Sequence, residues 1–232
     1  MKVEEFVEAC RKKGVQWSSD QLDRFYRYAD LLKSWNEKMN LTAITEFEEV
    51  LEKHFYDSLI PFFGMTLEGK LCDVGAGAGF PSIPLKIMAP QLEVTILEPL
   101  NKRVTFLKEV ASVLQLQHIH IVNQRAEDYA RQHREEFDLV TARAVAALPV
   151  LAELCLPLVR QGGLFVAMKG AAGHQEKTQA QKAIDTLGAR LEDVQQVSLS
   201  DGSQRINLMY RKIRKTPPQY PRPYVRIKKN PL

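Results

Sequence analysis

The pattern of apolar residues divides the chain into a helical N-terminal part and a part in which short apolar runs alternate with helix-length segments. Within residues 1–65, apolar positions recur every three or four residues, which is typical of helices that bury one face. The clearest stripe comprises Leu22, Phe25, Tyr26, Ala29, Leu32 and Trp35. The sequences Ser18 to Gln21 and Thr45 to Glu48 fit the capping box and predict helix starts. We interpret the aromatic stripe as core packing.

From Lys70 onward the pattern is typical of an α/β protein. Strands are predicted over 70–74, 92–97, 119–122, 137–142 and 163–168, and helices over 81–88, 102–115, 126–133, 148–158 and 175–187. This alternation predicts βαβ units, and therefore a parallel sheet with right-handed crossovers. The last two runs, 191–199 and 205–213, flank a turn-rich joint and predict a β-hairpin. We expect a mostly parallel sheet with an antiparallel edge.

Composition excludes several classes of protein. Of the 232 residues, 45% are hydrophobic and 26% charged, as in a folded globular chain. No apolar stretch approaches the ~18 residues of a membrane helix, and the N-terminus lacks the apolar core of a signal peptide. The three cysteines, Cys10, Cys72 and Cys155, share no metal-ligand spacing. We therefore expect a cytoplasmic protein without membrane contact, disulfides or a metal site.

The C-terminal end differs in charge from the rest of the chain. After Asp201 there is no acidic side chain, and five of the twelve prolines lie in this stretch. Its basic residues are Arg205, Arg211, Lys212, Arg214, Lys215, Arg222, Arg226, Lys228 and Lys229. These residues lack acidic neighbours, and the prolines favour an extended arm. Such an arm is typical of a protein that binds a polyanion, although a merely solubilising tail has the same composition.

The strongest chemical signal is the glycine loop DVGAGAGFP at 73–81, where the first predicted strand meets the first helix. Gly75, Gly77 and Gly79 allow a sharp turn and a close approach of a ligand to the backbone. The spacing is G-x-G-x-G rather than the dinucleotide fingerprint G-x-G-x-x-G, and Asp73 precedes it. A carboxylate here repels a pyrophosphate and suits a cationic or zwitterionic ligand.

Acidic residues also follow the next two predicted strands. Glu98 ends the second strand, and Glu127 and Asp128 follow the third. An acid in the first of these places accepts hydrogen bonds from ribose hydroxyls, and one in the second can accept from an adenine amino group. Together with Asp73 and the glycines, they predict a pocket for an adenosine that carries a positive group.

The combined motifs resemble one family, the bacterial small-subunit ribosomal RNA guanine-N7 methyltransferases, once called glucose-inhibited division protein B. The segments that carry the resemblance are 35–44 (WNEKMNLTAI), 54–59 (HFYDSL), the glycine loop, 100–103 (LNKR), 141–146 (TARAVA) and the tail from 220. The resemblance implies a Rossmann-like class I methyltransferase fold with a seven-stranded sheet. It divides the chain into an N-terminal helical extension (1–65), an S-adenosylmethionine-binding domain (66–213) and a basic Pro-rich tail (214–232).

The resemblance also implies an activity, the transfer of a methyl group from S-adenosylmethionine to N7 of a guanine in a decoding-region loop of 16S rRNA. The partner would be 16S rRNA or the small ribosomal subunit, and we expect the enzyme to be a monomer. With the motif residues above, the expected cofactor contacts are Asp73, Gly75, Gly77, Gly79, Phe80, Glu98, Ala126, Glu127 and Arg143. Glu98-Pro99 departs from the Asp-Ser that is more usual in the family.

The residues support the same chemistry by exclusion. Methylation of an exocyclic amine usually calls for an Asn/Asp-Pro-Pro-aromatic loop, and the corresponding position here, 141–144, reads TARA. Methylation of a pyrimidine carbon needs a nucleophilic cysteine, whereas Cys72 and Cys155 lie in core-like runs. Guanine N7 carries an unshared electron pair and needs no base, so we expect no catalytic acid or base, with Arg143 as a candidate orienting residue.

The remaining expectations concern RNA and the rival functions. The expected RNA contacts are Lys169, Arg222, Arg226, Lys228 and Lys229, and His54 is expected to be structural. A nucleotide-dependent oxidoreductase is disfavoured by Asp73 and the glycine spacing. A non-enzymatic RNA-binding protein is disfavoured by the intact acidic strand ends. A methyltransferase for another RNA site or for a small molecule is the closest alternative, and the basic tail argues against the small molecule.

Overall fold

The computed structural model describes residues 1–232, and its seven strands follow the order β3-β2-β1-β4-β5-β7-β6. The pairs β2–β3, β1–β4 and β4–β5 are parallel, and β5–β7 and β6–β7 are antiparallel. This arrangement confirms the predicted α/β class, with a mostly parallel sheet and an antiparallel edge hairpin. No helix combines the length and the apolar character needed to cross a membrane.

The chain forms two compact units. The first comprises residues 1–68 and 76–123, and the second comprises 69–75 and 124–232. The three predicted segments, 1–65, 66–213 and 214–232, are defined by the pattern and motifs of the sequence. The two units are instead defined by which residues contact one another in space. Residues 1–68 thus belong with the segment 76–123, which begins inside the glycine loop, and the tail belongs with the strands of the second unit.

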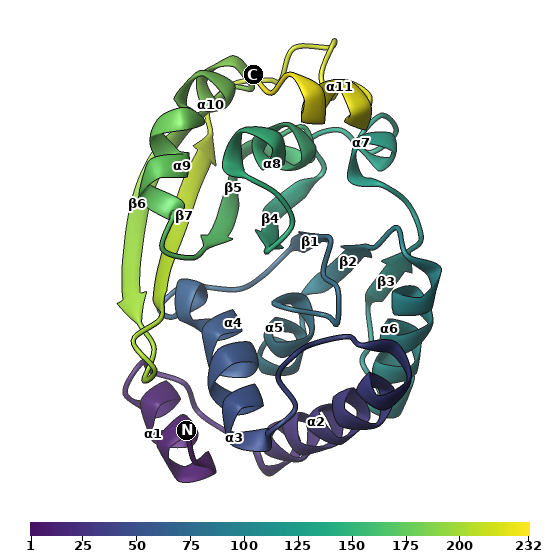
Figure 1. Ribbon diagram of the computed structural model, residues 1–232, viewed down its shortest axis with the longest axis vertical. Coiled ribbons are helices and arrows are strands. Elements are labelled where there is room, and N and C mark those ends of the chain that lie inside the picture. Colours follow the sequence, from purple (N-terminus) through teal and green to yellow (C-terminus); the bar gives the residue numbers. More distant parts are fainter. The chain divides into compact units, whose positions relative to one another are not determined.

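The first unit packs helices around the β2–β3 pair (Figure 1). Its elements are α1 (Val3–Arg11), α2 (Ser19–Met39), α3 (Phe47–Val50), the π-helical turn η1 (Leu51–Tyr56), α4 (Asp57–Leu59), the 3-10 turn η2 (Ile60–Phe62), α5 (Ser82–Met88), β2 (Glu93–Leu97), α6 (Asn101–Val113) and β3 (Ile119–Val122). In α2 the predicted stripe buries Phe25, Ala29 and Leu32, while Tyr26 remains 43% exposed. Helix α2 contacts α5 and α6, so the N-terminal helices support the elements that follow the glycine loop.

One of the two predicted capping boxes is confirmed and the other is wrong. The Ser18 side chain accepts from the backbone N–H of Gln21, and the Gln21 side chain accepts from the N–H of Ser18. Helix α3, in contrast, begins at Phe47 with Glu46 as its N-cap, and no side-chain cap is formed. Thr45 therefore lies one position before the N-cap, out of reach of the box geometry.

The second unit contains the other five strands (Figure 1). Its elements are β1 (Lys70–Val74), α7 (Ala126–Tyr129), β4 (Phe137–Arg143), α8 (Leu148–Cys155), β5 (Val159–Lys169), α9 (Gly173–Gln179), α10 (Gln181–Thr186), β6 (Ala189–Ser198), β7 (Gln204–Lys212) and α11 (Tyr224–Lys229). Helix α7 is shorter than predicted, and the helix expected over 175–187 is two helices that meet at Ala180. Helix α8 contacts β4 and β5, and Cys72 and Cys155 are fully buried, as expected of core residues.

The expectation of an extended tail with unpaired charges is wrong. Several basic side chains after Asp201 form ion pairs with acids that precede it: Arg211 and Lys212 of β7 with Glu192 and Glu135, and Arg222 of the tail with Glu153. Helix α11 contacts α8 and buries Ile227. The sequence argument failed because it counted only acids nearby in sequence, whereas an ion pair needs proximity in space.

Arg134 fixes the start of the tail. Its guanidinium donates to the carbonyl oxygen of Thr216 at 3.0 Å and also to that of Tyr220. The Thr216 hydroxyl accepts from the Lys212 ammonium at 2.8 Å and donates to the carbonyl of Leu187 at 2.9 Å. Backbone polar groups that would otherwise face solvent are thus bonded, and the tail is an ordered part of the second unit.

Candidate functional site

In the first unit, the glycine loop turns tightly at Gly77 and Gly79. The backbone N–H groups of Gly79 and Phe80 both donate to the Ala76 carbonyl, at 2.8 and 3.1 Å. Gly79 has φ +100°, and a Cβ there would lie 2.6 Å from Ile83 Cγ1, so packing requires glycine. Gly77 has φ +61°, and the nearest atom to a Cβ there is 3.9 Å away. A side chain at Gly77 is therefore disfavoured by the positive φ rather than by packing, since only the Arg103 guanidinium lies within van der Waals distance of a Cβ.

Glu98 lies at the end of β2 and is bonded to this loop. Its side chain is 1% exposed, and Oε2 accepts from the N–H of Gly77 at 3.1 Å while Oε1 accepts from that of Leu100 at 2.9 Å. The guanidinium of Arg103 lies 3.7 Å from Oε2. A buried carboxylate held by two backbone donors is a fixed acceptor, which is what recognition of vicinal ribose hydroxyls requires.

Phe80, which ends the loop, packs among aromatic rings of the N-terminal helices. Its ring centroid lies 4.5 Å from that of His54, in a stacked arrangement, and 5.5 Å from that of Tyr28. The Tyr28 hydroxyl donates to the carbonyl of Ala78 inside the loop. His54 itself is 9% exposed and bonded to Thr42, which supports its predicted structural role.

In the second unit, β1 carries the residues that enter the glycine loop. Asp73 is fully buried, and Gly75 has φ +71° with Val145 Cγ2 2.8 Å from the position of a Cβ. Burial raises the pKa of Cys72 and of Cys155 well above the ordinary value. Both are protonated thiols at neutral pH, which makes them unsuited to nucleophilic catalysis.

The residues expected to contact adenine lie at the start of α7. Ala126 and Glu127 are 6% and 4% exposed, and burial raises the pKa of the Glu127 carboxyl. The preceding residue, Arg125, places its guanidinium 5.2 Å from the ring centroid of Tyr224 in α11. This cation–π contact joins the proposed adenine-binding residues to the tail.

The two basic residues at the ends of β4 and β5 differ in surroundings. Arg143 is half-buried at the end of β4, next to Ala144, which has φ +57°. Lys169, 9% exposed at its side chain, lies 2.8 Å from a carboxylate oxygen of Glu176 and donates to the Ala146 carbonyl at 2.8 Å. The charge of Lys169 is therefore already balanced, which weakens it as a phosphate contact.

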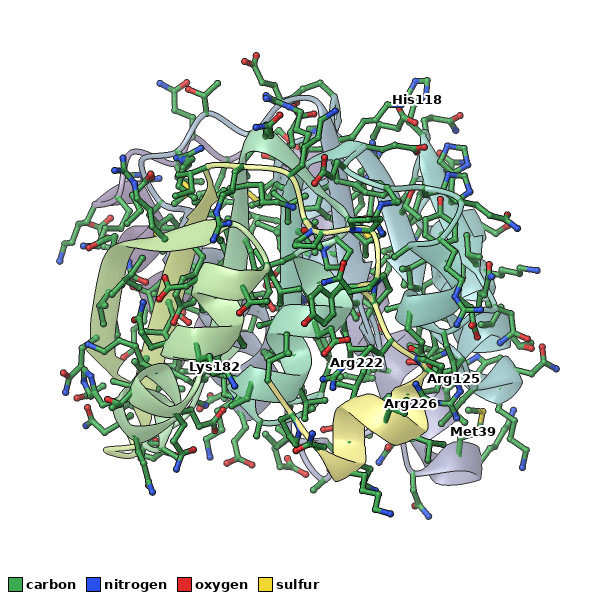
Figure 2. All side chains as sticks on the ribbon, turned by 90° about the horizontal axis from the view of Figure 1, so that it is seen from above. Met39, His118, Arg125, Lys182, Arg222 and Arg226 are labelled. Carbon is green, nitrogen blue, oxygen red and sulfur yellow. The ribbon has the colours of Figure 1, made fainter.

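The tail residues expected to bind RNA also fall into two groups. Arg226, Lys228 and Lys229 are exposed on α11, whereas Arg222 is bound to the buried Glu153. In Figure 2, Arg226 lies on α11 and Arg222 in the stretch that leads into it. Arg125, the N-cap residue of α7, lies near them. The exposed basic surface of the tail is thus a helix end rather than an arm.

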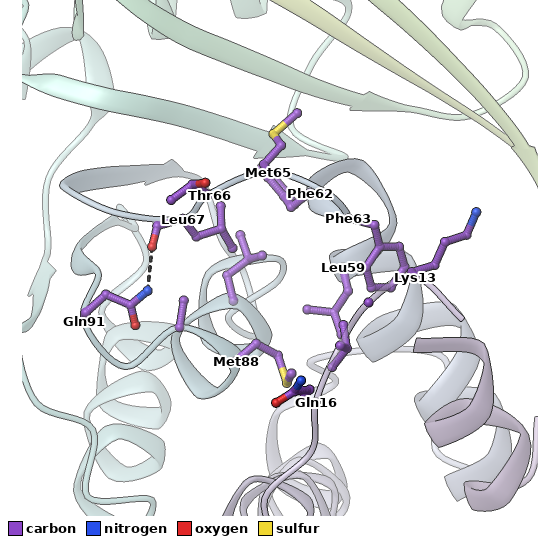
Figure 3. A pocket seen from close by; sticks show the side chains of 15 residues that line it. Lys13, Gln16, Leu59, Phe62, Phe63, Met65, Thr66, Leu67, Met88 and Gln91 are labelled. Carbon is purple, nitrogen blue, oxygen red and sulfur yellow. Dashed lines mark hydrogen bonds between the residues drawn. The ribbon is translucent and has the colours of Figure 1, made fainter. Parts of the chain in front are cut away.

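A cavity of the first unit lies away from these residues. It has a volume of about 460 Å³ and is lined by residues of the loops after α1 and η2 and of the end of α5, among them Lys13, Phe63, Leu67 and Met88 (Figure 3). None of the residues predicted for cofactor or RNA lines it. No group of three or more His, Cys, Asp or Glu side chains has the arrangement of a metal site.

Sequence reasoning missed Tyr28, Thr42, Arg134 and Glu153. Tyr28 and Thr42 lie in the helical part read as core, yet their hydroxyls bond to the glycine loop and to His54. Glu153 interrupts an otherwise apolar run, which was a signal that it has a partner.

Comparison with known proteins agrees with this geometry. A family model described as rRNA small subunit methyltransferase G matches residues 21–207. Ribosomal RNA small subunit methyltransferase G of Lysinibacillus sphaericus is 50% identical over 227 residues, which cover 96% of this chain and 95% of that protein. The protein of the same name from Bacillus subtilis is 48% identical, with coverage of 100% and 99%.

Solved structures show the same fold at low sequence identity. The M. jannaschii protein TYW2, in complex with AdoMet, has a TM-score of 0.54 at 13% identity and covers 86% of this chain and 79% of its own. A 16S rRNA (adenine(1408)-N(1))-methyltransferase from Catenulisporales acidiphilia has a TM-score of 0.54 at 15% identity, with coverage of 68% and 88%. The fold is therefore that of Rossmann-like methyltransferases. The chain belongs to the rRNA small subunit methyltransferase G family, as its motifs predicted.

Proposed function

We propose that this enzyme transfers the methyl group of S-adenosylmethionine to N7 of a guanine in a decoding-region loop of 16S rRNA. The observation that carries the proposal is the nearly full-length match, at 48–50% identity, to proteins named for methylation of small-subunit rRNA. The enzyme acts as a cytoplasmic monomer on 16S rRNA or on the small subunit.

The residues fit an adenosine that carries a positive charge. The proposed cofactor contacts are Asp73, Gly75, Gly77, Gly79, Phe80, Glu98, Ala126, Glu127 and Arg143. The fixed carboxylate of Glu98, which is buried and accepts from the backbone N–H of Gly77, supports the proposal, because such a carboxylate can accept hydrogen bonds from ribose hydroxyls. When bound, S-adenosylmethionine supplies a methyl group on a positively charged sulfur.

The chain's own residues then have to bind and orient rather than move protons. Guanine N7 attacks with its unshared electron pair, so no base is needed, and alignment alone can contribute about 7–11 kcal/mol. Arg143 is the candidate orienting residue for the guanine edge or the cofactor carboxylate, because a guanidinium donates several hydrogen bonds in a fixed plane. For RNA phosphates, we propose the exposed Arg226, Lys228 and Lys229, with Arg222 and Lys169 as weaker contacts.

A matched pair of glycine variants tests the cofactor site. Gly77→Ala places a methyl group on the glycine loop, 3.9 Å from the Arg103 guanidinium, whereas Gly202→Ala lies in the β6–β7 turn with nothing within 4 Å. Both residues have positive φ, so both variants carry similar backbone strain. Calorimetry should show that Gly77→Ala loses S-adenosylmethionine binding and that Gly202→Ala keeps it. Equal affinities in the two variants would contradict the placement.

Methyl transfer tests the reaction itself. Purified protein is incubated with labelled S-adenosylmethionine and with small subunits or naked 16S rRNA, and the modified base is mapped. We expect one N7-methylguanine in the decoding region. Label on an adenine, on another guanine or only on small molecules would refute the assignment and favour one of the alternatives.

Salt dependence of RNA affinity tests the tail. Replacing Arg226, Lys228 and Lys229 by Gln should reduce the slope of log affinity against log salt by up to about 2, at about 0.7 per contact for a single strand. A control variant with three exposed basic residues outside the tail replaced, Lys12, Lys182 and Arg190, has the same change in net charge. Equal slopes in the two variants would show that the tail has no specific role.

A further inference from the structure

A hydrogen-bonded turn follows α2 in the first unit. The Asn36 side-chain oxygen accepts from the backbone N–H of Thr42 at 2.8 Å, which closes the turn. The Thr42 hydroxyl accepts from the N–H of Ile44 at 3.0 Å and lies 2.8 Å from Nε2 of His54. One hydroxyl therefore joins the turn to the π-helical segment η1.

The contacts of His54 indicate the direction of the hydrogen bond between its ring and the Thr42 hydroxyl. Nδ1 of His54 lies 3.2 Å from the Lys53 carbonyl, which can only accept, so in the neutral form of the ring this contact assigns the proton to Nδ1. Nε2 is then an acceptor, and the Thr42 hydroxyl donates to it while accepting from Ile44. The proton and one lone pair of the hydroxyl are then used, which restricts the orientation of the His54 ring.

The fixed ring supports the glycine loop. The rings of His54 and Phe80 are stacked, with an interplanar angle of 19° and centroids 4.5 Å apart. Phe80 is 5% exposed, and its backbone N–H closes the loop onto Ala76. A rotation of the His54 ring would remove one wall of the Phe80 site and free the end of the loop.

We propose that Thr42 and His54 are positioning residues for the cofactor, because they hold Phe80 and with it residues 76–80 in the shape that binds S-adenosylmethionine. This inference rests on the proposed function. Neither residue touches a reacting atom. Their contribution is preorganisation, since a loop that is already ordered loses less conformational entropy on binding.

Two substitutions at Thr42 test the proposal. Thr42→Val removes the hydroxyl with little change of shape, and Thr42→Ser keeps it. The loss of one hydrogen bond should raise the Kd of S-adenosylhomocysteine about three- to tenfold in Thr42→Val, whereas Thr42→Ser should retain the wild-type Kd. In turnover, Thr42→Val should raise KM for S-adenosylmethionine with kcat and RNA affinity unchanged.

Thr105→Val is the matched control. Thr105 is exposed in α6 of the same unit, and its hydroxyl donates only to the helix carbonyl of Asn101. A lower melting temperature of Thr42→Val with an unchanged Kd would show a purely structural role and overturn the proposal. An equal loss in Thr42→Ser would overturn it as well. Failure of the wild-type protein to bind the cofactor product would instead refute the proposed function, and the inference with it.

Discussion

Removal of Arg222, the partner of the buried Glu153, should be among the most destabilising single changes in the second unit. The Glu153 carboxylate is fully buried in α8, and the Arg222 side chain is 21% exposed. The guanidinium reaches both carboxylate oxygens, from Nη2 at 2.6 Å and from Nε at 2.9 and 3.1 Å. The backbone N–H of Arg222 adds a hydrogen bond to Oε1 at 2.8 Å.

Removing one partner of such a pair leaves a buried charge without its counter-ion. Arg222→Met keeps an apolar stem but leaves Glu153 with the backbone donor, so we expect a loss of about 3–5 kcal/mol in the free energy of unfolding. An exposed ion pair would contribute only about 0–1 kcal/mol. Because the buried carboxylate causes the loss, Glu153→Gln combined with Arg222→Met should recover most of it. The neutral amide oxygen can still accept from the backbone N–H of residue 222.

Urea denaturation of the wild type, the two single variants and the double variant provides the measurement. The midpoint should fall in Arg222→Met and return toward the wild type in the double variant, with the slope m unchanged. A loss of less than about 1 kcal/mol in Arg222→Met would refute the reasoning, because the pair would then behave as if exposed. Additive effects of the two substitutions would also refute it, since they would show no coupling between the residues.

Three further predictions concern the loop, pH and the backbone. Glu98→Gln should weaken S-adenosylhomocysteine binding by about 1–3 kcal/mol in calorimetry, because a neutral amide is a poorer acceptor for ribose hydroxyls and for Gly77. Burial raises the pKa of Cys10 from 9.0 to about 12, so its stabilising effect is complete below pH 9 and is lost as pH rises toward 12. Cys10→Ala should therefore make the fall of unfolding free energy above pH 9 shallower by up to about 1.4 kcal/mol per pH unit in urea titrations. Gly188→Ala should cost at least about 1–2 kcal/mol, because φ is +86° and the Cβ would lie 2.4 Å from the Arg214 carbonyl oxygen; an unchanged melting temperature would contradict this.

Element order and the glycine loop could be predicted because their signals are local. Alternating runs of apolar residues locate each strand to within a few residues, and the glycines at 75, 77 and 79 indeed have positive φ. The first residue of a helix was harder to predict than its presence. A capping residue acts only if the helix begins directly after it, as at Ser18, and the chain around Thr45 enters α3 one residue later.

The polar contacts that complete the site were beyond local reasoning. The Thr42 hydroxyl bonds to His54, twelve positions away, and the Tyr28 hydroxyl bonds to Ala78, fifty positions away. Glu153 and Arg222 are separated by 69 positions. The sequence placed Thr42, His54 and Ala78 in motifs and Glu153 and Arg222 among the charges, and it did not single out Tyr28. The partner of each residue depends on how distant elements pack.

The ordered tail changes the physical account of RNA binding. Counterion release requires that a cation approach a phosphate with its charge available, and the Arg222 charge is balanced by a carboxylate that cannot leave the core. The salt slope attributable to the last residues is therefore limited by the exposed Arg226, Lys228 and Lys229, at most about 2 rather than the ~3 that four free cations would give. Because α11 is already packed on α8, these cations lose little backbone entropy on binding. If the tail contacts RNA as proposed, the early order of its helix offsets part of the affinity that the smaller number of available charges would cost.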